Sequence, residues 1–93
     1  MQVPTAQEEG LIMESFDNRF GRFSHPITIC GIVKRRLQAL ELLPQKGDTE
    51  DLTIKARQDL QLAEAAGRVF ARKGDVYALK YFEQPIHDIH VVR

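Results

Sequence analysis

Cys30 is the single thiol of the chain and therefore the first candidate for nucleophilic chemistry. A catalytic cysteine needs a base within reach and a lowered thiol pKa. The nearest histidine in the sequence, His25, is separated from it by Pro26. Cys30 lies between Ile29 and Gly31, and free cysteines in apolar surroundings are among the most buried side chains. We therefore expect Cys30 to be a small buried side chain and assign no catalytic residue.

The C-terminal residues His87, Asp88 and His90 form the only cluster of metal-ligand types in the sequence. A zinc site usually needs three or four ligands, and a further histidine such as His25 would have to be brought in by the fold. The alternative is that these side chains form the polar face of a terminal strand. We favour that alternative and expect no metal and no cofactor.

Cations alternate with aromatics in the segment Arg19-Phe20-Gly21-Arg22-Phe23. Arginine and aromatic side chains are enriched at binding hot spots, and the same combination can bind the phosphates and bases of single-stranded nucleic acid. The alternative is that both phenylalanines anchor a loop to the core while the arginines remain in water. The predicted partner-binding surface consists of Arg19, Phe20, Arg22, Phe23, Lys34, Arg35 and Arg36.

The charges are balanced overall but unevenly distributed. Thirteen basic and 13 acidic residues give zero net charge, so there is no general attraction to nucleic acid or to a membrane surface. By segment the net charge is −4 over residues 1–18, +5 over 19–46, −3 over 47–66 and +2 over 67–93. Such a distribution predicts a dipolar surface that orients a partner.

The motifs that would indicate an enzyme are absent from the sequence, which contains no phosphate-binding glycine loop, nucleophile elbow, paired Cys-x-x-Cys or dinucleotide fingerprint. We therefore expect a small non-enzymatic interaction protein, an accessory subunit, adaptor or regulator that binds a protein partner or self-assembles. One alternative is a nucleic-acid-associated factor that uses the basic and aromatic segment 19–36. Another is a subunit that contributes to an oligomeric enzyme.

The first two predicted elements are a helix and a loop. Thr5 and Glu8 match the capping box, which predicts a helix over about 6–16. Residues 17–26 contain Asn, Gly, Ser and Pro without a sustained period, and this predicts a loop. Pro26 suits the first position of a following helix.

Apolar residues at spacings of three and four predict a helix over 27–43, although the β-branched start of this segment could instead form a buried strand. Residues 44–48 read as a turn, with Asp48 or Thr49 capping the next helix. That helix, over about 50–73, carries an apolar stripe and should hold the core. The stripe consists of Leu52, Ala56, Leu60, Ala63 and Phe70.

Beyond Gly74, a C′ residue by type, the pattern is ambiguous. Asp75 could cap a short helix, or residues 76–82 could form a strand. The tail 86–93 has the composition of a strand or an extended arm. The fold class is therefore mainly α, a small bundle of three to four short helices with an irregular 17–26 loop and a C-terminal strand or arm; the alternative is α+β.

Residues 66–83 resemble the turn between the two helices of a tetratricopeptide repeat. The residues that carry this resemblance are Ala66-Gly67-Arg68-Val69-Phe70-Ala71-Arg72-Lys73-Gly74-Asp75, followed by Ala78-Leu79-Lys80-Tyr81-Phe82-Glu83. Two residues, Val76 and Tyr77, precede Ala78, one fewer than in that family. The resemblance covers about a fifth of the chain and implies a helical hairpin at this place.

With 93 residues and 43% hydrophobic content, the chain can form one core and hence one domain over 1–93. A single cysteine allows no internal disulfide, and no apolar run reaches the ~20 residues that span a bilayer. The first residues do not resemble a secretory signal. We therefore expect a cytoplasmic location and no membrane association.

Overall fold

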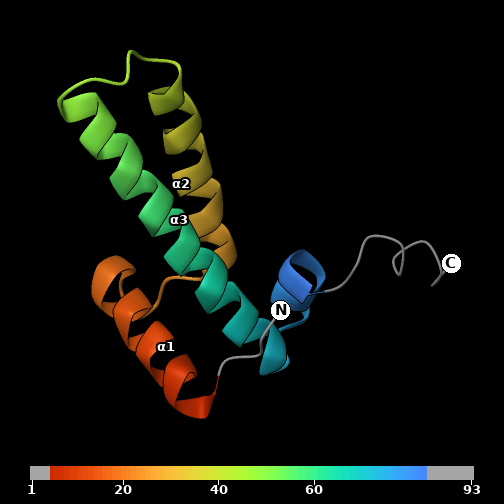
Figure 1. Cartoon of the computed structure of the whole chain (residues 1–93). Helices are drawn as coiled ribbons and strands as arrows, with labels where there is room; N and C mark the ends of the chain where they lie inside the picture. The colour runs from red at the N-terminus through yellow and green to blue at the C-terminus, as the bar shows by residue number, and fades with distance from the viewer. Residues whose placement is uncertain (1–4, 84–93) are drawn as a thin grey trace, which may run out of the picture.

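The longest helix, α3, spans Asp48–Arg72 and contacts each of the other helical segments. Figure 1 shows α2 alongside it for much of its length and α1 beside its C-terminal part. The computed structural model describes residues 5–83. Within them α1 spans Ala6–Phe20, α2 spans Pro26–Glu41, α4 spans Val76–Ala78 and the π-helical η1 spans Leu79–Glu83.

No strand occurs within residues 5–83, so the predicted mainly helical bundle is confirmed and the strand alternatives for the start of α2 and for 76–82 are wrong. The strand or arm predicted for 86–93 lies outside the described residues. No helix in the described part of the chain is both long and apolar enough to cross a membrane.

The capping box predicted for α1 is present. The Glu8 N–H donates to the Thr5 hydroxyl at 3.2 Å, and the Thr5 N–H donates to the Glu8 carboxylate at 3.0 Å. These two bonds satisfy donors that have no partner within the helix, and they hold the pKa of Glu8 below its ordinary value.

The loop predicted over 17–26 is wrong at its start, because α1 continues to Phe20 and the loop is shorter than expected. The extra turn of α1 is held from a distance. Arg19 pairs with Asp59, 40 residues away, and Phe20 packs against buried residues of α1, α2 and α3. Such tertiary contacts override a local sequence that has no strong helical period.

Helix α2 begins as predicted with Pro26 at its first position. His25 precedes it as the N-cap, and its Nδ1 accepts from the Ile27 N–H at 3.2 Å. The start of α3 differs from the prediction, since the N-cap is Gly47, with φ 58°, and no side chain caps the helix. Asp48 and Thr49 lie inside the helix instead.

The end of α3 follows the predicted pattern. Gly74 has φ 96° and occupies the C′ position. The N–H of Gly74 donates to the Ala71 carbonyl at 3.2 Å, and that of Asp75 donates to the Phe70 carbonyl at 3.0 Å. These are the two bonds of a Schellman motif. Asp75 then caps α4 by accepting from the Ala78 N–H at 2.8 Å, so residues 66–83 form helix, turn and helix.

The core is made largely of small side chains. Phe16 from α1, Cys30 from α2 and Ala63 and Ala66 from α3 are fully buried and form one cluster. Phe82 of η1 packs against this cluster, and its ring lies directly against Gly67, where any side chain would displace it. Small residues on α3 therefore let three other elements approach it closely.

Two parts of the molecule differ in how far other helices pack on α2 and α3. The base, residues 5–35 and 59–83, contains the core cluster and every contact of α1 described above. The hairpin half, residues 36–58, is the end of α2, the turn and the start of α3, and it projects past α1 (Figure 1). In the predicted stripe, Ala56 is buried but Leu52 is 53% exposed, because no third helix within residues 5–83 lies beside the start of α3 (Figure 1).

Candidate partner-binding surface

The five-residue loop between α1 and α2, residues 21–25, forms a fixed corner. The Gly21 N–H closes α1 on the Asp17 carbonyl, and the Ser24 hydroxyl donates to the Phe20 carbonyl at 2.6 Å. His25 contributes a further bond, from its Nε2 to the Asp75 carboxylate at 2.9 Å. Hydrogen bonds therefore constrain the loop on both sides of Arg22 and Phe23.

The two phenylalanines of the predicted surface have different environments. Phe20 is half-buried and packs against the core cluster, so it acts as an anchor. Phe23 is 97% exposed, and Arg22 next to it is also exposed. The anchoring interpretation therefore fits Phe20, and the partner-binding interpretation fits Phe23.

Arg19 forms an ion pair with a buried carboxylate. Its Nε and Nη2 donate to the two oxygens of Asp59 at 3.0 and 2.9 Å, a bidentate arrangement. The Asp59 side chain is only 8% exposed, whereas that of Arg19 is 41% exposed. The guanidinium also lies 5.4 Å from the centre of the Phe20 ring. Asp59 thus neutralises the charge of Arg19.

The three basic residues of α2 do not share one face. Lys34 donates to the Tyr81 hydroxyl at 2.7 Å and lies 5.0 Å from the centre of that ring, and this hydrogen bond raises the pKa of Lys34. Arg35 and Arg36 are exposed, and Arg36 turns towards α1 and α3. The structure therefore brings Arg36 together with Arg19 and separates both from Lys34.

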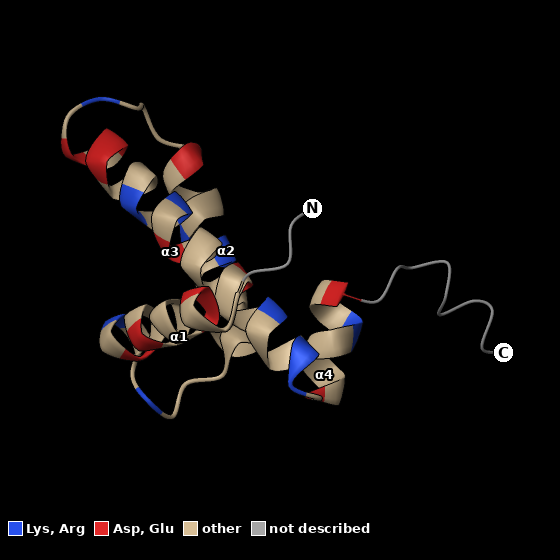
Figure 2. Cartoon of the chain, turned by 60° about the horizontal axis from the view of Figure 1, so that its bottom comes forward, with Lys and Arg blue, Asp and Glu red and all other residues tan. Residues whose placement is uncertain are grey.

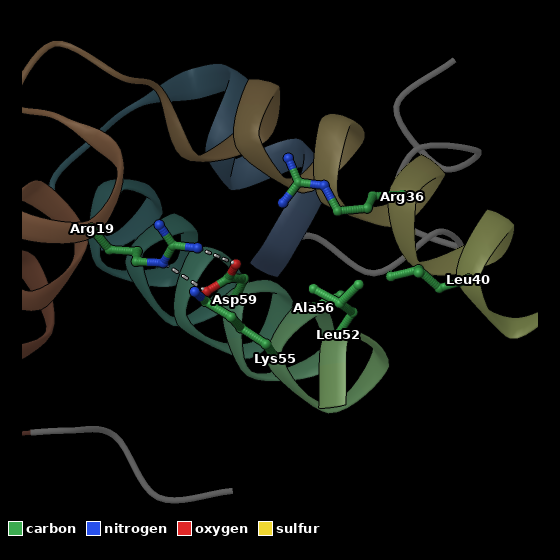
Figure 3. A pocket seen from close by; sticks show the side chains of 7 residues that line it. All are labelled: Arg19, Arg36, Leu40, Leu52, Lys55, Ala56 and Asp59. Atoms are coloured by element: carbon green, nitrogen blue, oxygen red, sulfur yellow. Dashed lines mark hydrogen bonds and ion pairs between the residues drawn. The ribbon is translucent and has the colours of Figure 1, made fainter. Parts of the chain in front are cut away.

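An open groove of about 260 Å³ lies where α1 ends against α2 and α3. Figure 3 shows its apolar side chains gathered at one end, with Arg19, Lys55 and Asp59 at the other and Arg36 reaching across. Neither Arg36 nor Lys55 makes an ion pair with any residue of 5–83. We call this feature the groove; its lining residues are Arg19, Arg36, Leu40, Leu52, Lys55, Ala56 and Asp59.

Sequence reasoning missed the α3 side of the groove. Leu52, Lys55 and Asp59 recur at spacings of three and four, which places them on one face of a helix. That spacing could have indicated a mixed apolar and charged face. Nothing in the sequence indicates that Arg19 would meet Asp59, because this contact depends on how α1 docks.

Cys30 is fully buried, as predicted, and burial raises the pKa of its thiol to about 11. The thiol is therefore protonated near neutral pH and inaccessible, which makes it unsuited to attack a substrate. Both ring nitrogens of His25 are engaged by Ile27 and Asp75. The described residues contain no group of three or more potential ligands that could hold a metal, and His87, Asp88 and His90 lie outside them.

No protein-family model matches this chain, and comparison with curated proteins and with solved structures finds no match either. Arguments about function therefore rest on the surface itself.

Proposed function

We propose that this protein is a small non-enzymatic interaction domain, an adaptor or regulator, that binds a partner protein at the corner formed by residues 21–25. The observation that carries this proposal is the 97% exposure of Phe23 on a loop held by hydrogen bonds. Burying a phenylalanine contributes ~1.5–3 kcal/mol, and a fixed loop loses little entropy when a partner docks. Arg22 beside it supplies directional donors at the rim.

The layout of charge supports a protein partner over nucleic acid. A binder of single strands needs a basic path with aromatic platforms along it. Here Arg19 is neutralised by Asp59, Phe20 faces the core, and Lys34 is bonded to Tyr81. The predicted basic and aromatic segment is thereby divided among three separate environments.

The test is affinity capture from extracts of the cells that make the protein, with the full chain as bait. Phe23→Ser should lower retention of the specific partner about tenfold or more, the loss expected for a hot-spot aromatic. Leu42→Ser is the matched control, because Leu42 is 87% exposed but lies at the opposite end of α2. Both variants should keep the wild-type circular dichroism and melting temperature.

Undiminished capture by the Phe23→Ser variant would overturn the proposal. Light scattering over a wide range of concentration identifies a second copy of the chain as the partner if the mass rises and Phe23→Ser abolishes the rise. Salt-dependent binding to random oligonucleotides that Phe23→Ser leaves intact would favour the nucleic-acid alternative instead.

A further inference from the structure

The groove continues a helix-binding surface that α1 already occupies. Helix α1 runs along α3 from the Glu9–Arg72 ion pair, past the contact of Phe16 with the core cluster, to the Arg19–Asp59 pair, and the chain then turns away at Gly21. Figure 1 shows that, among the described helices, α2 alone runs alongside the preceding part of α3, residues 48–58, and α1 reaches it only with its end at Arg19. The side of the α2–α3 hairpin that receives α1 in the base is therefore open in the hairpin half (Figure 1).

The size of the open stretch fits two turns of an added helix. Leu52 and Asp59 mark its ends on α3, and seven residues of helix rise by about 10 Å. Its apolar end offers the side chains of Leu40 and Leu52 above the buried Ala56. One large side chain, or two at a spacing of three or four, would fill such a recess, which is how amphipathic helices engage grooves.

The charge of the groove determines which polar side chains its occupant must carry. Asp59 is matched by Arg19, so Arg36 and Lys55 leave an excess of two positive charges. A helix docked on the apolar end would partly desolvate both cations, and this is favourable only if carboxylates meet them. Arginine can hold such a carboxylate bidentately. A basic or neutral helix would leave the two cations without partners.

The acidic tip of the hairpin limits where these carboxylates can lie. Figure 2 shows acidic residues on both helices near the tip, a basic stretch in the turn, which contains Lys46, and basic residues below on both helices. The first turn of α3 contains Asp48, Glu50 and Asp51. An acidic helix would be repelled there, so its carboxylates must lie at the level of Arg36 and Lys55, about one turn from its apolar anchors.

We infer that the groove is a second binding site, which takes an acidic amphipathic helix from a partner protein, with apolar anchors on Leu40 and Leu52 and carboxylates on Arg36 and Lys55. This site is separate from the corner at Phe23, and the test of one site does not depend on the outcome for the other. A protein with both sites would join two partners.

The probe for this inference is a displayed library of stable two- to four-turn helices with randomised exposed positions, selected on the full-length chain. Enriched helices should carry two apolar residues three or four positions apart and an excess of Asp and Glu about one turn away. They should bind Arg36→Glu/Lys55→Glu about tenfold or more weakly than the wild type. Replacing their acidic residues by lysine should restore binding to that variant, and added salt should weaken the wild-type complex.

The matched control is Arg35→Glu/Lys80→Glu, which reverses two exposed charges outside the groove and should bind the selected helices like the wild type. If the groove reversal unfolds the chain, Leu52→Ser replaces it, since this exposed side chain is not needed for the core and its loss should weaken binding about tenfold. Three results would overturn the inference: no helix enriched over the unselected library, enriched helices without acidic excess, or equal binding to the groove variants. Phe23→Ser should leave helix binding intact, which separates this result from the test of the corner.

Discussion

The base and the hairpin half are built from the same two long helices, but the buried core cluster lies in the base alone. In the base, α1, α4 and η1 close around the small side chains of α3, and Phe16 is fully buried among them. In the hairpin half, α2 and α3 have only each other, and Leu42, Leu43, Leu52 and Ile54 remain exposed. Full burial in the hairpin half is limited to the small side chains of Thr53 and Ala56.

The difference also appears in the helix starts. Side chains cap α1, α2 and α4, through Thr5, His25 and Asp75, and all three starts lie in the base. The start of α3, in the hairpin half, is Gly47 with no side-chain cap. We expect the hairpin half to contribute less to stability than the base and to keep its apolar and basic side chains available to a partner.

The largest expected difference is in core packing. Phe16→Ala in the base should lower the free energy of unfolding by about 3–5 kcal/mol, the usual cost of removing a fully buried aromatic side chain. Leu52→Ala in the hairpin half should cost less than about 0.5 kcal/mol, because its side chain is already half in water. Urea denaturation of both variants measures the difference. Similar losses would show that the hairpin half is packed in solution.

Breaking an ion pair should also cost more stability in the base than in the hairpin half. Arg19→Met in the base leaves the enclosed carboxylate of Asp59 without its partner, and we expect a loss of about 1–2 kcal/mol, reduced from the buried limit because Arg19 is partly exposed. Arg57→Met in the hairpin half breaks the exposed pair with Glu41 and should cost no more than about 0.5 kcal/mol. The double variant with Asp59→Asn should recover part of the first loss.

Two helical glycines test how closely the base is packed. Gly67→Ala improves helix propensity by about 1 kcal/mol but displaces the Phe82 ring, and such overpacking costs ~1–3 kcal/mol, so we expect a net loss of about 1 kcal/mol. Gly10→Ala faces open space on α1 and should stabilise by ~0.5–1 kcal/mol. Thermal melts compare the two. A stabilising Gly67→Ala would mean that η1 does not dock on α3.

The fold was largely predictable where the causes are local. The period of α3, the capping box of α1, Pro26 at the start of α2 and the Schellman end at Gly74 depend on neighbouring residues, and each appears as expected. The end of α1 was not predictable, because the Arg19–Asp59 pair that holds its last turn joins residues 40 positions apart.

The candidate site was predictable only in its residue types. Sequence reasoning selected arginines and phenylalanines near residues 19–36, but Phe20 and Phe23 are equivalent by type and differ only in which one reaches the core. The predicted stripe on α3 likewise placed Leu52 and Ala63 on the same apolar face, although Leu52 is half exposed and Ala63 is fully buried. Which residues of an amphipathic face are covered depends on the length of α1, and that length is set by tertiary contacts.

The smallest expected effect is the loss of stability at low pH when Asp75, which caps α4 in the base, becomes protonated. Asp75 accepts from the Ala78 N–H and from His25, and these bonds hold the pKa of its carboxyl below the ordinary value. Near that ordinary value, about pH 4, the unfolded chain binds the proton more readily than the folded one, so the stability due to ionised Asp75 is complete above it. It is lost as the pH falls through the lower folded-state pKa. Asp75→Asn can still cap α4 but does not titrate.

The melting temperature of the wild type should therefore exceed that of Asp75→Asn near neutral pH, and the difference should shrink steadily as the pH is lowered below about 4. Subtracting the two curves removes the titration of the groups that do not contact Asp75, Glu8 included, since both proteins contain them. Asp51→Asn in the hairpin half is the matched control, because Asp51 lies in the first turn of α3 but makes no side-chain cap there. The acid-dependent difference from the wild type should be larger for Asp75→Asn than for this control, because only Asp75 accepts a capping hydrogen bond. A parallel acid loss at both positions would mean that the start of α3 is stabilised as strongly as the starts in the base, and the contrast between the two parts would then reduce to core packing alone.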